Sequence, residues 1–151
     1  MPALVHGTAV VIGTTGLIVV GPSGSGKTSI ALRLVAEARR EGHFAAFVSD
    51  DQVLVELVNG RLVATAPPTI KGMVELRGSG IGRVETIEHA VLAFALEPVV
   101  ADAAHRIPEE NQYWAPIRDV SLPLHFIDSA VADPFTRLVA LMPGFPIGVQ
   151  S

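Results

Sequence analysis

A glycine-rich segment constrains this chain more than any other feature of its sequence. Residues 21–28 match the pattern G-x-x-x-x-G-K-[ST] and consist of Gly21, Pro22, Ser23, Gly24, Ser25, Gly26, Lys27 and Thr28. An apolar run typical of a strand precedes them, and apolar residues recur at helical spacing over residues 28–40. In this order of strand, loop and helix, backbone N–H groups and the helix start can face an anion. The sequence therefore predicts a phosphate-binding loop (P-loop) for a nucleotide.

Two side chains at the end of this segment suit the chemistry of a nucleotide. We expect Lys27 to neutralise the outer phosphates of ATP and the Thr28 hydroxyl to ligate Mg²⁺. The alternative is a glycine-rich turn that binds nothing. Such a turn rarely has Lys-Thr together with both flanking elements, so we favour nucleotide binding. No motif indicates specificity for guanine.

The remaining pattern predicts an α/β fold: a P-loop domain with a mixed β-sheet flanked by helices. Residues 4–12 and 17–20 indicate a hairpin, and residues 44–48 indicate a buried strand. Asn59-Gly60, between residues 53–58 and 61–64, is a strong signal for a second hairpin. Further elements are expected at residues 90–97 (strand), 124–127 (strand) and 133–142 (helix), with no regular pattern between residues 98 and 123.

Composition limits the classes of protein to which the chain can belong. Its 151 residues, 49% apolar and 17% charged, suit one folded domain over residues 1–151. The net charge of −4 argues against a broad surface for nucleic acid or anionic membrane. The absence of cysteine excludes disulfides, thiolate zinc sites and a cysteine nucleophile. No apolar stretch approaches a membrane span and no signal peptide is evident, so we expect a cytoplasmic protein.

Two adjacent acids follow the predicted strand at residues 44–48. If that strand lies beside the strand that precedes the loop, Asp50 can hold Mg²⁺ or its waters. Side chains alternate along an extended chain, so Asp51 would point elsewhere and could accept a proton from an attacking hydroxyl. The alternative is that both acids merely cap a turn. The neighbouring loop favours the catalytic interpretation.

A third motif points to a particular family. The segment Val74-Glu75-Leu76-Arg77-Gly78-Ser79-Gly80-Ile81 has the form E-[apolar]-R-G-x-G-I and follows the Asp50-Asp51 pair. Together with the loop, His6-Gly7 and Arg106, it resembles the catalytic domain of HPr kinase/phosphorylase. The resemblance covers nearly the whole chain and implies the P-loop fold of that domain.

The resemblance also implies roles for individual residues. Lys27 and Thr28 would contact phosphates and Mg²⁺, Glu75 would be a second metal ligand, and Asp50 would serve the metal or its waters. Asp51 would accept the proton of the acceptor hydroxyl. The residues that would neutralise the transferred phosphoryl group are Arg77, Arg106 and His6.

By resemblance, the chain is expected to be an ATP- and Mg²⁺-dependent serine kinase that acts on a small HPr-like phosphocarrier of the phosphotransferase system. The resemblance also implies that the kinase assembles as a hexamer. We expect a minimal form that lacks the family's N-terminal domain. The family's basic loop for phosphate removal is not recognisable in residues 126–131, so any phosphorylase activity should be weak. The alternatives are a non-catalytic ATP-sensing module and a small-metabolite kinase. The second would normally need an arginine-rich lid, whereas the arginines here are scattered.

Overall fold

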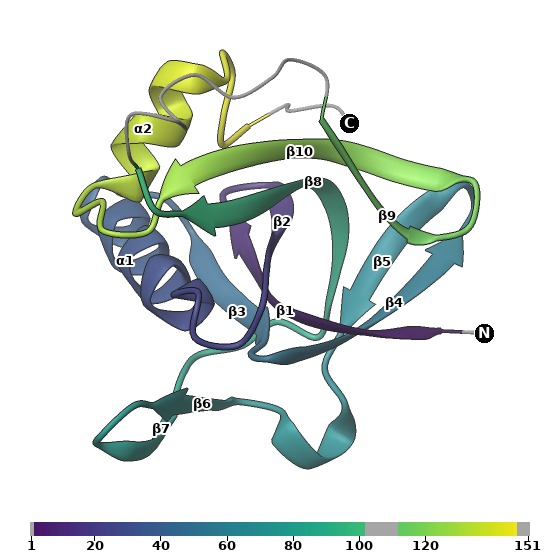
Figure 1. Ribbon diagram of the computed structural model, residues 1–151, viewed down its shortest axis with the longest axis horizontal. Coiled ribbons are helices and arrows are strands. Elements are labelled where there is room, and N and C mark those ends of the chain that lie inside the picture. The colour runs from purple at the N-terminus through teal and green to yellow at the C-terminus, as the bar shows by residue number, and fades with distance from the viewer. Residues whose placement is uncertain (1, 102–111, 148–151) are drawn as a thin grey trace.

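The structure is a computed structural model that describes residues 2–101 and 112–147 (Figure 1). A bent sheet forms its centre, two helices cover one side of the sheet, and a small hairpin projects from the body. In chain order the elements are β1 (Ala3–Ile12), β2 (Thr15–Val20), α1 (Lys27–Arg40), β3 (Ala45–Ser49), β4 (Gln52–Val58), β5 (Arg61–Thr65), the 3₁₀ helix η1 (Pro68–Ile70), β6 (Met73–Leu76), β7 (Gly80–Arg83), β8 (His89–Val99), β9 (Tyr113–Ile117), β10 (Val120–Asp128) and α2 (Pro134–Leu141).

The central sheet closes on itself. Its strands run in the order β2-β1-β4-β5-β8-β10-β9, and β8 also pairs with β2, which completes a ring of five strands. The strand β1 makes this possible because residues 3–6 pair with β4 while residues 7–12 pair with β2. The strands β2, β8 and β10 are parallel neighbours, and β3 pairs antiparallel with β1 and so runs in the same direction as β2. The carboxyl ends of β2, β3, β8 and β10 therefore share one edge, where open α/β sheets commonly bind ligands.

Alternation along β2 divides the core into two apolar clusters. Leu17 and Val19 belong to the cluster that contains α1 and α2, whereas Ile18 and Val20 belong to the cluster formed by the ring strands. Because successive side chains of a strand point to opposite faces, a strand buried on both faces must be apolar throughout. This explains the unbroken apolar run immediately before the 21–28 loop.

The two helices are joined by a buried acid. The carboxylate of Glu37 in α1 accepts hydrogen bonds from the backbone N–H groups of Phe135 (2.9 Å) and Thr136 (3.1 Å) and from the Thr136 hydroxyl. These N–H groups lie in the first turn of α2, where a helix has no partners of its own for them. Glu37 thus caps α2 from a neighbouring helix and fixes the C-terminal layer against α1.

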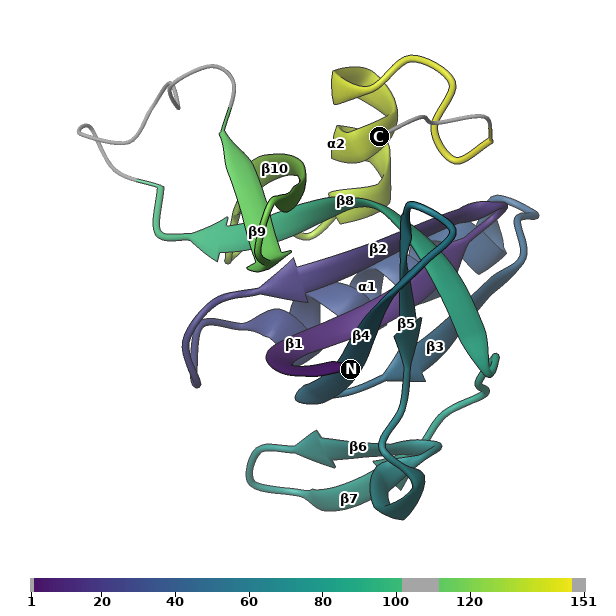
Figure 2. The same cartoon turned by 90° about the vertical axis from the view of Figure 1, so that its right-hand side faces the viewer.

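The hairpin of β6 and β7 extends below the body (Figure 2). Val74 anchors it: this side chain is 2% exposed and belongs to the cluster under α1. At the base of the hairpin, the Val84 N–H donates to the Gly72 carbonyl at 3.0 Å. The segment Glu75 to Arg77 is consequently held next to the edge where β2 and β3 end.

Most of the predicted elements are confirmed, and two regions were missed. Both predicted hairpins form, and Asn59 and Gly60 have φ of 51° and 78°, as a tight two-residue turn requires. The expectation of no regular pattern between residues 98 and 123 was wrong, because β9 and the start of β10 lie there. The hairpin of β6 and β7 was also not foreseen as an element. No helix in the described part of the chain is long and apolar enough to cross a membrane.

Candidate functional site

The 21–28 loop connects the carboxyl end of β2 to the start of α1, as the sequence predicts. Gly21, Gly24 and Gly26 have φ of 135°, 81° and 98°, values that side chains with a Cβ rarely adopt. A Cβ on Gly21 would lie 3.0 Å from the Ser25 Oγ, so the loop folds back closely on itself. The glycines of the motif are therefore required by the conformation of this turn.

Two polar side chains of the loop are turned into it. Lys27 is only 6% exposed, and its Nζ donates a hydrogen bond of 2.9 Å to the Pro22 carbonyl. The Ser25 Oγ is buried and has no hydrogen-bond partner among the described residues. A buried hydroxyl without a partner loses the free energy of its hydration, and an anion held in the loop would restore a partner. The donors of the loop thus fit a phosphate group.

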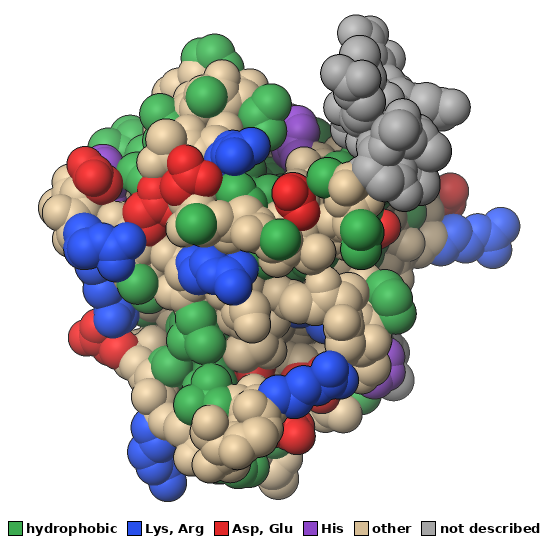
Figure 3. Space-filling model, turned by 60° about the vertical axis from the view of Figure 1, so that its left-hand side comes forward, with side chains coloured by type: hydrophobic (Ala, Val, Ile, Leu, Met, Phe, Trp, Pro, Cys, Tyr) green, Lys and Arg blue, Asp and Glu red, His purple; other side chains and the backbone are tan. Residues whose placement is uncertain are grey.

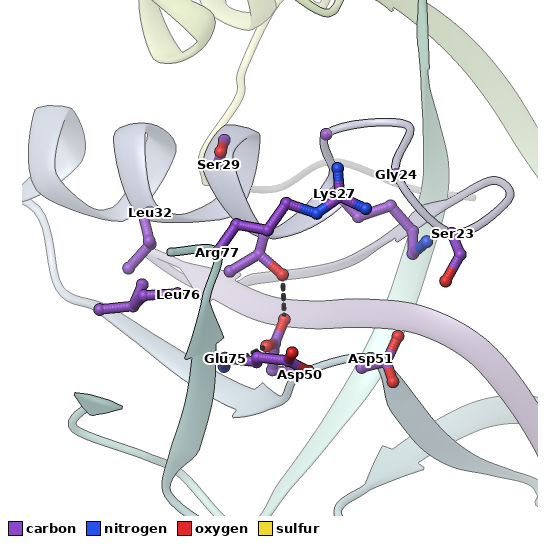
Figure 4. A pocket seen from close by; sticks show the side chains of 12 residues that line it. Ser23, Gly24, Lys27, Ser29, Leu32, Asp50, Asp51, Glu75, Leu76 and Arg77 are labelled. Atoms are coloured by element: carbon purple, nitrogen blue, oxygen red, sulfur yellow. Dashed lines mark hydrogen bonds between the residues drawn. The ribbon is translucent and has the colours of Figure 1, made fainter. Parts of the chain in front are cut away.

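Asp50 is the centre of the site. Asp50 is 5% exposed, and its Oδ1 accepts hydrogen bonds from the hydroxyls of Thr8 and Thr28, both at 2.8 Å. The bond from the start of α1 to Asp50 is drawn as a dashed line in Figure 4. The Asp50 Oδ2 lies 3.4 Å from the Glu75 N–H. Asp50 therefore connects β1, the start of α1 and the hairpin strand β6, three segments far apart in sequence.

Asp51 lies in a different environment from its neighbour. It is exposed and has φ of 67°, so the chain turns sharply between β3 and β4. Its carbonyl accepts a hydrogen bond of 3.0 Å from the Gly7 N–H, and its own N–H lies 3.4 Å from the Thr8 Oγ1. The two acids thus point differently, as expected: Asp50 inward to the threonines and Asp51 outward to solvent.

A cleft of about 460 Å³ lies between the loop, the two acids and the hairpin. Arg77 borders it from the hairpin side, and its guanidinium would lie 3.2 Å from a Cβ placed on Gly24. The hairpin and the loop therefore form opposite walls of one cavity. The residues that line it are Ser23, Gly24, Gly26, Lys27, Thr28, Ser29, Leu32, Asp50, Asp51, Glu75, Leu76 and Arg77.

The structure brings most of the residues proposed from sequence into this cleft, with a few exceptions. Gly21, Pro22 and Ser25 shape the loop without lining the cavity. His6 is exposed on β1, opposite Gln52 of β4, and does not line the cavity either. Arg106 lies outside the described residues.

Thr8 is a residue of the site that its sequence pattern did not predict. It is 0% exposed, and its hydroxyl contacts both members of the Asp50-Asp51 pair. The sequence holds one signal for it, a polar residue within the apolar run of β1, immediately after His6-Gly7. Its partner 42 residues away can only be identified once the pairing of β1 with β3 and β4 is known.

The oxygens of the cleft suit a hard divalent cation only in combination with other ligands. Within the described residues, no three His, Asp or Glu side chains form a cluster that could hold a metal ion. Thr28, Asp50 and Glu75 nevertheless line the same cavity, and the Thr28 hydroxyl is bonded to the Asp50 carboxylate. Mg²⁺ is commonly bound by one or two carboxylates together with substrate phosphates and water, so this set of oxygens fits Mg²⁺ that arrives with a nucleotide.

Comparisons with known proteins agree with this geometry. Residues 2–105 match the family described as HPr Serine kinase C-terminal domain. The HPr(Ser) kinase/phosphatase from Coxiella burnetii superposes with a TM-score of 0.68 and 19% identity, over 91% of this chain and 96% of that one. At this identity the likeness shows a shared fold. A search of curated proteins finds no match. On the strength of the match over residues 2–105, the chain belongs to the HPr Serine kinase C-terminal domain family.

Proposed function

We propose that the chain is an ATP-dependent protein kinase that transfers the γ-phosphoryl group to a serine of a small HPr-like phosphocarrier. The observation that carries this proposal is the position of Asp50, a buried carboxylate bonded to Thr28 beside the 21–28 loop, with the exposed Asp51 next to it. One acid can serve the metal-bound nucleotide while the other faces an incoming hydroxyl. Membership of the family supports the serine and the carrier as the acceptor.

The loop would bind the phosphates of ATP. Its backbone N–H groups and the start of α1 favour negative charge, and the Lys27 ammonium already lies inside the loop, 2.9 Å from the Pro22 carbonyl. When ATP binds, Lys27 can exchange that carbonyl for phosphate oxygens without leaving the loop. Thr28, Asp50 and Glu75 would hold Mg²⁺, which neutralises phosphate charge as it develops.

Asp51 would act as the general base. It is exposed toward the cleft, and its backbone is fixed at both its N–H and its carbonyl, which limits the freedom of its carboxylate. In the reaction the acceptor oxygen forms a bond to the γ-phosphorus, its proton passes to Asp51, and the bond to the bridging oxygen of ADP breaks. Holding the base and the phosphate loop on one rigid edge of the sheet supplies the orientation on which this transfer depends.

Arginines would stabilise the charge on the transferred group. Arg77 borders the cleft next to Gly24 and is the described arginine best placed for this task. The roles expected for His6 and Arg106 remain predictions. If His6 takes part, it must do so from β1 outside the cavity lining, for example through the acceptor.

The forward reaction should exceed the phosphate-dependent removal of phosphate from the carrier. The end of β10 lies beside the loop, since a Cβ on Gly26 would be 3.8 Å from the Ser129 Cβ. Asp128 precedes Ser129 there, where a basic residue would help to hold inorganic phosphate. Pyrophosphate release from phosphorylated carrier in excess phosphate measures the reverse rate, and a rate equal to the forward transfer contradicts this expectation.

The test of the proposed function is the acceptor itself. Purified chain with Mg-ATP should phosphorylate an HPr-like carrier on one serine, located by mass spectrometry, and a Lys27→Ala variant that remains folded should not. Phosphate transfer to a metabolite in place of the carrier would favour a small-metabolite kinase. Tight ATP binding without transfer to either acceptor would favour a nucleotide-sensing module.

A further inference from the structure

The phosphate site leaves the nucleoside of ATP without assigned contacts. The transferred phosphoryl group has to lie toward Asp51 and Arg77, where the acceptor hydroxyl is activated and the developing charge is stabilised. The other phosphates then pass through the 21–28 loop, so the nucleoside emerges on the side of the loop away from the acids. In Figure 4 the labelled acids lie below α1, whereas Ser29 lies on its upper side. The cleft reaches that side too, because Gly26 and Ser29 both line it.

The turn between β10 and α2 borders the loop on this side. A Cβ on Gly26 would lie 3.8 Å from the Cβ of Ser129. The N–H groups of residues 129–131 are all hydrogen-bonded within the protein, at distances from 2.8 to 3.1 Å, and two of them donate to Asp128. Val131 is 4% exposed and belongs to the core cluster that contains α1. The turn is therefore a fixed wall beside the loop.

Arg33 of α1 forms the other part of this wall. It follows Ser29 by four residues, so the two side chains share one face of the helix and lie about 6 Å apart along its axis. The Arg33 Nη1 donates a hydrogen bond of 3.2 Å to the Val131 carbonyl, which holds the side chain against the turn. Arg33 is exposed and forms no ion pair with any described residue, unlike Arg39 of the same helix, which pairs with Glu85. The planar guanidinium of Arg33 is thus held in place and open to a ligand.

The charges on this side of the molecule favour a local contact over a general field. Figure 3 shows the side on which α1 and the turn after β10 lie in Figure 1, and acidic and basic side chains lie close together across it. With a net charge of −4, the chain has no broad positive field to attract a nucleotide. An arginine can instead hold an aromatic base by direct stacking, because its guanidinium is planar and its positive charge is attracted to the face of the ring.

We infer that the nucleoside of ATP lies between the turn at residues 128–131 and α1, with its base stacked on the guanidinium of Arg33. The 21–28 loop holds the phosphates, and Arg33 holds the other end of the same molecule. Arg33 therefore contributes affinity for a nucleotide but not for its phosphates alone. This inference rests on the proposed function for the presence of ATP in the loop.

Tripolyphosphate separates the two ends of the site, because it has the three phosphates of ATP and no nucleoside. In calorimetric titrations at one Mg²⁺ concentration, wild type should bind ATP more tightly than tripolyphosphate. Arg33→Ala should weaken ATP binding about tenfold and leave tripolyphosphate binding unchanged, because the lost contact involves the base. Arg33→Gln, which keeps an N–H donor for the Val131 carbonyl but has no cation, should lose as much affinity for ATP. Arg40→Ala and Arg40→Gln, at an exposed position of the same helix, are matched controls and should bind both ligands as wild type does.

Kinetics of transfer to the carrier give a second measurement. Both Arg33 variants should raise the KM for ATP about tenfold with kcat nearly unchanged, because the base is remote from the phosphorus that reacts. Retained binding of tripolyphosphate shows that each variant is folded. Equal affinity of wild type for ATP and tripolyphosphate, or equal weakening of both ligands in the variants, would overturn the inference.

The nucleoside site and the kinase assignment can fail separately. If wild type phosphorylates the carrier and both Arg33 variants bind ATP as wild type does, the nucleoside site is wrong and the kinase assignment stands. If wild type prefers ATP to tripolyphosphate without transferring phosphate, and the variants lose that preference, the nucleoside site is supported and the kinase assignment fails. A wild-type enzyme that binds neither ligand overturns both.

Discussion

The hydroxyl of Thr8 offers the sharpest test of how the acid pair is held. Thr8→Val keeps the shape of the side chain but removes the donor to Asp50 Oδ1, at 2.8 Å, and the acceptor near the Asp51 N–H. Thr8 is 0% exposed, so water cannot easily replace the lost partner. A hydrogen bond to a charged group contributes about 1.5–3 kcal/mol, and we expect the free energy of unfolding to fall by about 2 kcal/mol.

A matched control separates this effect from the loss of any buried hydroxyl. Thr15 is 3% exposed, and its hydroxyl donates to the neutral carbonyl of Pro146, away from the cleft. Thr15→Val should therefore lower the free energy of unfolding by only about 1 kcal/mol and leave transfer unchanged. Thr8→Ser, which keeps the hydroxyl, should retain most of the wild-type transfer rate.

Urea unfolding measures the stability of each variant, and a Mg²⁺ titration of ATP binding measures the effect on the site. Thr8→Val should require more Mg²⁺ for half-maximal binding, because Asp50 loses one of the two hydroxyls that orient it. Thr8→Val with wild-type stability and an unchanged Mg²⁺ requirement would refute the idea that Thr8 positions the acid pair.

Three further outcomes are expected. Asp51→Asn should slow phosphoryl transfer about 10²–10⁴-fold while Mg-ATP binding changes much less, whereas Asp50→Asn should weaken both transfer and binding. Single-turnover kinetics measures transfer and nucleotide titration measures binding. The opposite pattern would mean that Asp50 is the base and Asp51 serves the metal. Burial lowers the pKa of His125 in the folded protein below its ordinary 6.5. As pH drops below about 6.5, the unfolded chain therefore binds a proton at this histidine more readily than the folded protein does, and the free energy of unfolding should fall. His125→Asn should reduce that slope in urea unfolding at pH 7.5 and 5.5, and an unchanged slope would exclude His125 as its source. Glu37→Ala should lower the free energy of unfolding by about 2 kcal/mol, because the N-terminus of α2 loses its cap, and a change within 0.5 kcal/mol of zero would contradict that role.

Local signals in the sequence were sufficient for most of the fold. The Asn59-Gly60 turn, the apolar run before the loop and the helical spacing after it each depend on a few neighbouring residues, and all three predictions are confirmed. The strand β9 escaped prediction because Pro116 interrupts its pattern. Among the described strands β9 pairs with β10 alone, so tertiary pairing outweighs local preference there. The hairpin of β6 and β7 was hidden by its glycines, which read as loop.

In the candidate site, too, some residues could be predicted from local sequence and others depend on the pairing of distant strands. The 21–28 loop and the Asp50-Asp51 pair could be found because each is contiguous in sequence. Thr8 could not be found, because its hydrogen bond to Asp50 depends on the register between distant strands.

The position of the label in ATP tests the central claim most directly. If the 21–28 loop and the acid pair form one phosphotransfer site, label from the γ-phosphate of ATP should appear on a serine of the HPr-like carrier. Label from the α-phosphate should not appear there, and the folded Lys27→Ala variant should transfer neither. Transfer from the α-phosphate, or γ-phosphoryl transfer by Lys27→Ala at the wild-type rate, would contradict the account.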